Sequence, residues 1–149
     1  MALEVEFSLD LFHGEEDWSD SASGVADLLR SSVRINQRYL RSHPNAPSPF
    51  KKDPNGRYLL RYLSAHANEP REKFRSIAEI VECGGSDCDG IVPYVVAWRR
   101  EREGDSTADI FLQWKRGLEP GTLKYHVLET NGRKAVGDPC RTLGMGSGT

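Results

Sequence analysis

The sequence lacks a long hydrophobic run, and it lacks a strong excess of either charge. No apolar stretch reaches the ~18 residues that a membrane-spanning helix needs, and the first residues have neither the basic start nor the apolar core of a secretory signal. The 20 basic and 22 acidic residues give a net charge of −2, which provides no electrostatic footprint for nucleic acid. We therefore expect a cytoplasmic protein with no membrane partner and no nucleic-acid partner.

Cysteine is scarce as well, with three residues, Cys83, Cys88 and Cys140. An odd count argues against a disulfide framework and fits a reducing compartment. Together with His126, the cysteines are residue types that bind zinc, and the spacing of Cys83 and Cys88 falls in the loose range for zinc ligands. No second closely spaced ligand pair accompanies them, so zinc is the weaker interpretation, and we expect neither a metal nor a cofactor.

Length and composition are typical of one globular domain. The chain has 149 residues, of which 38% are hydrophobic and 28% are charged, enough to bury a modest core. Periodicity predicts a half-buried strand at 3–11, a helix from Asp20 or Ser21 to about Arg41, a short helix from Pro70 to about Glu82 and a central helix from Asp89 to Glu103. We expect a single domain over residues 1–145 and a flexible tail at 146–149.

The last third of the chain alternates in hydrophobicity, which predicts strands. These strands run over 108–115, 122–130 and 133–136, and Asn131-Gly132 is a strong two-residue hairpin signal between the last two. We therefore predict an α+β fold in which the helices pack on an antiparallel sheet formed mainly by this last third, with the opening strand joining that sheet.

The stretch GGSDCDG at 84–90 puts Cys88 where the central helix begins. Its two leading glycines allow a tight turn, and Ser86 or Asp87 can cap the helix. The nucleophilic form of cysteine is the thiolate, and a helix N-terminus lowers the thiol pKa because unpaired N–H groups point at the sulfur. Cys88 is therefore the candidate nucleophile. The simpler alternative is a small buried hydrophobic residue, against which the glycine-rich, acid-flanked surroundings argue.

His126 and Asp138 complete a candidate catalytic triad. The hairpin is expected to bring them near opposition, because His126 precedes the Asn-Gly turn by about as many residues as Asp138 follows it. His126 would accept the thiol proton of Cys88, and Asp138 would orient the imidazole and stabilise its charged form. The simpler alternative is that His126 is a strand histidine with its hydrogen bonds satisfied and that Asp138 is a turn residue before Pro139. Asp87 and Asp89 are interpreted as helix caps, because an acid beside the nucleophile opposes thiolate formation.

The ordered motifs resemble the transglutaminase-like superfamily of papain-fold cysteine enzymes, especially its small phage-encoded and bacterial members. The motifs are GGSDCD at 84–89, a following helix, Tyr-His-Val at 125–127 and Asp-Pro at 138–139; the resemblance spans roughly residues 70 to 145, and a weaker similarity reaches back to about residue 3. It implies a papain-like core in which a helix opens at Cys88, while His126 and Asp138 lie on neighbouring antiparallel strands.

Three positions depart from the family pattern. Ser86 stands where the family usually has glycine, Gly90 where it has an acid, and Cys140 where a serine often follows Asp-Pro. The departures leave the triad complete and affect the local hydrogen bonding and the substrate side of the pocket. The backbone N–H of Cys88 is a candidate oxyanion donor. Cys140 is interpreted as structural, with a redox bridge to Cys88 as the less favoured alternative.

The resemblance implies a cysteine peptidase or amidase that hydrolyses a protein or peptide substrate through an acyl-enzyme, with Cys88, His126 and Asp138 as catalytic residues. Transfer of the acyl group to an amine would use the same residues. An alternative of a different class is a structural or assembly component of a phage particle (tail, neck or head), with or without activity, because a fold does not fix a function. The partners would then be other phage structural proteins, and the location would be the virion.

Overall fold

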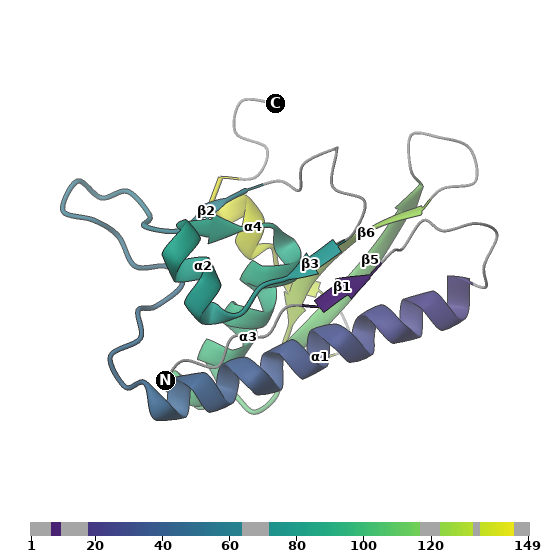
Figure 1. Ribbon diagram of the computed structural model, residues 1–149, viewed down its shortest axis with the longest axis horizontal. Helices are drawn as coiled ribbons and strands as arrows, with labels where there is room; N and C mark the ends of the chain where they lie inside the picture. The colour runs from purple at the N-terminus through teal and green to yellow at the C-terminus, as the bar shows by residue number, and fades with distance from the viewer. Residues whose placement is uncertain (1–6, 10–17, 64–71, 117–122, 133–134, 145–149) are drawn as a thin grey trace.

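The computed structural model describes residues 7–9, 18–63, 72–116, 123–132 and 135–144 (Figure 1). The helices are α1 (Trp18–Ser42), α2 (Ile77–Cys83), α3 (Cys88–Arg102) and α4 (Pro139–Thr142), and the strands are β1 (Phe7–Leu9), β2 (Arg61–Tyr62), β3 (Glu72–Phe74), β4 (Gly85–Ser86), β5 (Asp109–Arg116), β6 (Leu123–Thr130) and β7 (Ala135–Gly137). Together they make a mixed α+β fold, as predicted. Of the helices in these ranges, none is long and apolar enough to cross a membrane. The predicted tail at 146–149 lies outside the described residues.

The antiparallel sheet predicted for the last third of the chain is present as β5-β6-β7. β5 and β6 pair along their whole lengths. β7 returns along β6 after the segment that begins with Asn131 and Gly132, and the register shifts between Glu129 and Thr130. Hydrophobic alternation and the Asn-Gly signal therefore located the hairpin, but the predicted two-residue turn is wrong: Thr130 pairs with Ala135, so four residues separate the paired positions, and β7 spans Ala135–Gly137 rather than 133–136.

The prediction that the opening strand joins this sheet is wrong, because β1 pairs antiparallel with β3 instead. The predicted helix at 70–82 is wrong in its first half for a related reason: the chain is extended through β3, and α2 begins only at Ile77. Ser76 sets this start as the N-cap, since its Oγ accepts a hydrogen bond from the Glu79 N–H at 3.4 Å. The Ser-x-x-Glu capping pattern outweighs the upstream proline as a helix-start signal.

Helix α3 lies at the centre of the fold and is buried from Cys88 to Ala97. It contacts α1, α2, α4 and the strands β5 and β6 (Figure 1). A helix that is apolar all round is typical of one enclosed by its own domain. Pro93 lies in the second turn of α3, further in than the first turn where proline fits best. The long helix α1 covers one side of α3 and begins at Trp18, slightly before its predicted start.

The charged end of α3 is fastened to the end of α1. Nη2 of Arg102 donates to the carbonyl oxygens of Leu40 and His43, at 2.9 and 3.0 Å. The two carbonyl groups also accept the backbone N–H groups of His43 and Ala46, so Arg102 adds a second, charged donor at the end of α1. Arg41 forms an ion pair with Glu101 at 2.7 Å at the same junction. The two helices are therefore held side by side at this end by hydrogen bonds and charge as well as by apolar packing.

The turn from α2 into α3 requires glycine at three positions. Gly84 ends α2 in the left-handed conformation, with φ 82°. A Cβ on Gly85 would lie 2.0 Å from the carbonyl oxygen of Arg61, because β2 runs directly alongside. A Cβ on Gly90 would lie 2.3 Å from the Oγ of Ser86 and 2.9 Å from its Cβ. The side chain of Ser86 thus fills the space that Gly90 leaves open.

We predict that Gly90→Ala destabilises the fold by about 1–3 kcal/mol, because the added methyl group overpacks against Ser86. In a Ser86→Gly background the same substitution should cost less, since only Ile80 Cδ1, at 3.1 Å, then stays close to the added methyl group, and alanine exceeds glycine in helix propensity by about 1 kcal/mol. Gly24→Ala in α1 is the matched control and should stabilise, because nothing lies within 4 Å of its Cβ position. Urea unfolding measures these differences, and strictly additive effects of Gly90→Ala and Ser86→Gly would contradict the contact.

Candidate functional site

Cys88 is the first residue of α3, beside the start that the sequence predicts. Asp87 is the N-cap, and its Oδ1 accepts a hydrogen bond from the Asp89 N–H at 3.2 Å. The Cys88 residue is buried, with 8% of its surface exposed. Asp89 is buried too, and the thiol of Cys88 donates to its Oδ1 at 3.9 Å. The interpretation of both acids as caps therefore holds for Asp87, while Asp89 lies inside the fold beside the thiol.

The segment that leads into Cys88 is held by β2, which runs parallel to β4. The backbone N–H groups on either side of Tyr62 donate to the carbonyl oxygens of Gly84 and Ser86, at 3.0 and 2.9 Å. The Tyr62 N–H lies between them and donates in the other direction, to the carbonyl oxygen of Leu143 at 3.1 Å. β2 therefore ties the start of α3 to the end of α4.

The His126 Nε2 and the Asp138 Oδ2 are 3.0 Å apart. The expectation that the hairpin brings them together is confirmed, but they are not opposite each other. The register pairs Glu129 with Gly137, so Asp138 falls opposite Leu128 and His126 lies diagonally across from it, a separation that long side chains bridge. Asp138 is also the N-cap of α4, where its Oδ1 accepts a hydrogen bond from the Arg141 N–H at 3.3 Å.

The imidazole of His126 interacts with the Cys88 thiol as well as with Asp138. The interaction with Cys88 is the largest cause that raises the pKa of His126; the bond to Asp138 adds to it, and partial burial opposes both. Because Nε2 is bonded to Asp138, Nδ1 is the ring nitrogen left for Cys88. The structure thus brings together all three residues that the sequence singled out.

The pKa of the Cys88 thiol is raised, which is the opposite of the expected direction. Its interaction with the Cys140 thiol is the largest cause, burial is the next, and His126 acts the other way. The negative charge of Asp87 adds to the rise, as expected for an acid beside a thiol. The raised pKa favours the neutral thiol, and His126 is the neighbour that favours the thiolate.

Tyr62 also belongs to this site, although the sequence analysis did not single it out. Along 59–63 the inner residues are Leu60 and Tyr62, while Leu59, Arg61 and Leu63 are exposed. Burial raises the pKa of Tyr62, and the nearby Cys88, Asp87 and Cys140 raise it further, so the phenol keeps its proton at neutral pH. In the sequence, leucines fall on both faces of this segment, so no alternation of residue types marks Tyr62; its inward position follows from the pairing of β2 with β4.

Cys83 differs from the other two cysteines in solvent exposure. It is the last residue of α2 and is exposed, while Cys88 and Cys140 are buried. Among the residues with described positions, no three histidine, cysteine or acidic side chains are grouped so that they could hold a metal ion.

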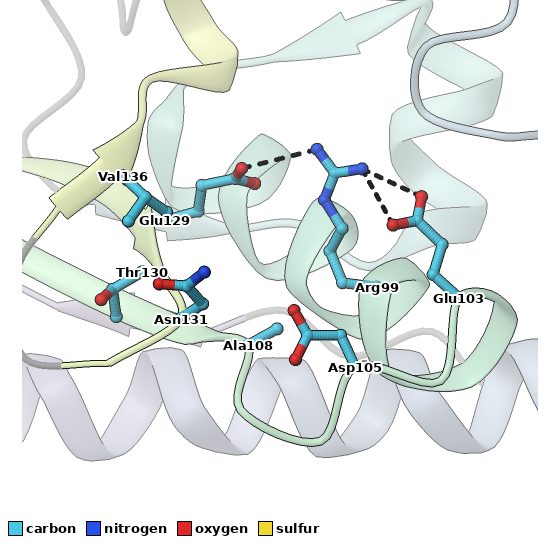
Figure 2. A pocket seen from close by; sticks show the side chains of 8 residues that line it. All are labelled: Arg99, Glu103, Asp105, Ala108, Glu129, Thr130, Asn131 and Val136. Carbon is cyan, nitrogen blue, oxygen red and sulfur yellow. Dashed lines mark hydrogen bonds and ion pairs between the residues drawn. The ribbon is translucent and has the colours of Figure 1, made fainter.

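A pocket of about 190 Å³ lies elsewhere, between the far end of α3 and the hairpin (Figure 2). Its lining residues are Arg99, Glu103, Asp105, Ala108, Glu129, Thr130, Asn131 and Val136. Arg99 forms ion pairs with Glu103 at 2.9 Å and Glu129 at 3.4 Å (Figure 2). Since Arg99 is eleven residues along α3 from Cys88, it is about 16 Å away along the helix axis. The pocket is an ion-paired junction separate from the cysteine site.

Comparison with models of known protein families, with curated proteins and with solved structures finds no match to this chain.

We predict that Asp138→Asn lowers the pKa of His126, because the substitution removes one of the two interactions that raise it. Asparagine remains a good N-cap, so α4 should persist. A raised histidine pKa stabilises the fold fully below the unfolded-chain value of about 6.5, and this stabilisation is lost as the pH rises through the folded pKa. The decline in stability above that pH should therefore be shallower in Asp138→Asn.

NMR titration of the imidazole protons and urea unfolding across pH measure the two effects. Asp105→Asn is the control, because the Asp105 carboxylate bonds to Thr107 and not to His126. An unchanged His126 titration in Asp138→Asn would show that the carboxylate does not act on the imidazole.

Proposed function

We propose that this chain is a cysteine-dependent amide hydrolase, a peptidase or amidase that acts through an acyl-enzyme on Cys88. The observation that carries the proposal is the 3.0 Å contact of His126 with Asp138, with Cys88 as the other neighbour of the imidazole. A nucleophile, a base and a group that orients the base are the parts that acyl transfer requires. A helix that opens at the nucleophile and a hairpin that carries the base also support a papain-like core of the transglutaminase-like kind.

In the acylation step His126 takes the thiol proton as the sulfur attacks the carbonyl carbon of the amide. The tetrahedral intermediate collapses when the imidazolium gives this proton to the leaving amine, and a thioester on Cys88 remains. Asp138 holds the ring in place and stabilises its positive charge. The raised pKa of His126 favours the step that forms the imidazolium.

In the deacylation step His126 removes a proton from water as its oxygen attacks the thioester carbonyl carbon. The C–S bond then breaks, the carboxylic acid product leaves, and the Cys88 sulfur takes the proton back from the imidazolium. An amine in place of water would give acyl transfer with the same residues. The Cys88 N–H is one donor to the oxyanion, because the first N–H groups of a helix have no partner within it. The protonated phenol of Tyr62 supplies a second donor from β2.

We predict that p-nitrophenyl acetate acetylates Cys88 in a rapid burst and that the thioester then turns over. The tests use a Cys83→Ala background, because Cys83 is exposed and would react by itself. Cys88→Ala should abolish the burst, and His126→Ala should slow it by about 10²–10⁴-fold, the usual contribution of a general base. Stopped-flow absorbance and intact mass give the rate and the site.

Burst kinetics that survive Cys88→Ala in a folded protein would rule out the acyl-enzyme. A Cys88 that reacts no faster than a free thiol, whether or not His126 is present, would favour the assembly role instead.

We predict that Tyr62→Phe slows acetylation by about 10²–10³-fold, the effect of removing one oxyanion donor. Its reaction with iodoacetamide should stay unchanged, because alkylation passes through no oxyanion. Comparison of the two rates in each variant separates a donor from a residue that only shapes the site. Equal losses in both reactions would assign Tyr62 to the positioning of the thiol.

A further inference from the structure

Helix α4 brings a second thiol to the nucleophile. Cys140 is the second residue of α4, and the N-cap of this helix, Asp138, is bonded to His126 at 3.0 Å. α4 packs against α3, whose first residue is Cys88. The far end of α4 is held as well, since the Leu143 carbonyl accepts the Tyr62 N–H at 3.1 Å. The position of Cys140 beside α3 is therefore fixed at both ends of its short helix.

Both thiols lie inside the same apolar core. Cys140 is fully buried, and 8% of Cys88 is exposed. They belong to one cluster of buried residues where α4 packs against α3. The nearby Cys140 thiol is also the largest influence that raises the pKa of Cys88. Cys83 is exposed at the end of α2 and belongs to no such pair. The pairing is thus specific to two of the three cysteines.

We propose that Cys88 and Cys140 are an oxidisable pair, in which Cys140 converts an oxidised Cys88 into an intramolecular disulfide. The proposal concerns a modification of the thiols and does not depend on whether Cys88 acts on amides. It fits the exposure of the two residues, because Cys88 retains some contact with solvent, where a small oxidant can reach it, while Cys140 has none.

The chemistry balances with a peroxide as the oxidant. The Cys88 thiolate, formed when His126 takes its proton, attacks one peroxide oxygen, and the O–O bond breaks. Cys88 becomes a sulfenic acid and one water leaves. The Cys140 sulfur then attacks the sulfenic sulfur, the S–O bond breaks, and a second water leaves with the Cys140 proton. Two thiols are oxidised to one disulfide while one peroxide is reduced to two waters.

A disulfide at this position would remove the nucleophile and protect it at the same time. A sulfenic acid without a neighbouring thiol is oxidised further to sulfinic acid, which thiol reductants do not reverse. A disulfide is reversed by thiol exchange. The pair would therefore turn irreversible oxidation of Cys88 into a reversible loss of its reactivity.

The experiment treats the reduced, folded chain with stoichiometric hydrogen peroxide and then maps the cysteines by mass spectrometry after unfolding. We expect the three free thiols to fall to one, Cys83, with Cys88 and Cys140 joined in one cross-linked peptide. Iodoacetamide labelling of Cys88 should be lost on oxidation and should return after dithiothreitol. Cys83→Ser is the matched control and should form the same bridge.

Cys140→Ser should instead give sulfinic Cys88, whose labelling dithiothreitol does not restore. Mapping of the natural chain decides the question even if this variant does not fold. Sulfinic Cys88 beside an intact Cys140 thiol in the natural chain, or intermolecular bridges through Cys83, would overturn the proposal. A failed acetylation burst with an intact bridge would count against the hydrolase alone.

Discussion

The two oxygens of the Asp138 carboxylate are the constraint on which the site depends. Oδ1 caps α4 by accepting the Arg141 N–H at 3.3 Å, and Oδ2 bonds to His126 at 3.0 Å. Because one short side chain does both, α4 cannot shift without moving the imidazole. Cys140 lies on this same helix, which packs against α3, so the bond between Asp138 and His126 also helps to fix the position of the second thiol. A hydrogen bond to a charged group is among the stronger ones in proteins, which suits it to this role.

Two of the three departures from the transglutaminase-like pattern, Ser86 and Gly90, compensate each other sterically. Ser86 carries a side chain where glycine is usual, and Gly90 lacks one where an acid is usual. A Cβ on Gly90 would meet the Ser86 hydroxyl at 2.3 Å, so each residue occupies or leaves space that the other requires. Since β4 and the first turn of α3 pack at this contact, the exchange preserves the turn that presents Cys88.

Local patterns predicted the elements that carry the site, and non-local contacts caused the errors. The hairpin with His126 follows from alternation and from Asn131-Gly132, and the start of α3 follows from the capping acid beside Cys88. The strand that pairs with β1 is β3, and the sequence analysis had assigned the residues of β3 to a helix starting at the upstream proline. Tyr62 joins the site through parallel pairing with β4, a contact between distant segments that no local period encodes. The same holds for Cys140, whose effect on Cys88 depends on how α4 packs.

The pKa of Cys88 is raised where the sequence predicted a lowering, and the sizes of the opposing effects explain why. A charge near a helix terminus gains typically 0.3–1 kcal/mol when exposed and up to about 2 kcal/mol when partly buried. One pKa unit corresponds to about 1.4 kcal/mol, so a helix N-terminus lowers a thiol pKa by roughly one unit. The Cys140 thiol and burial outweigh this and raise the pKa. A helix start is therefore sufficient to orient Cys88 and insufficient to ionise it. His126 opposes this rise, and its own pKa is raised by Cys88 and Asp138. The pKa of Cys88 is thus set less by the helix that presents it than by Cys140 on α4 and His126 on the hairpin.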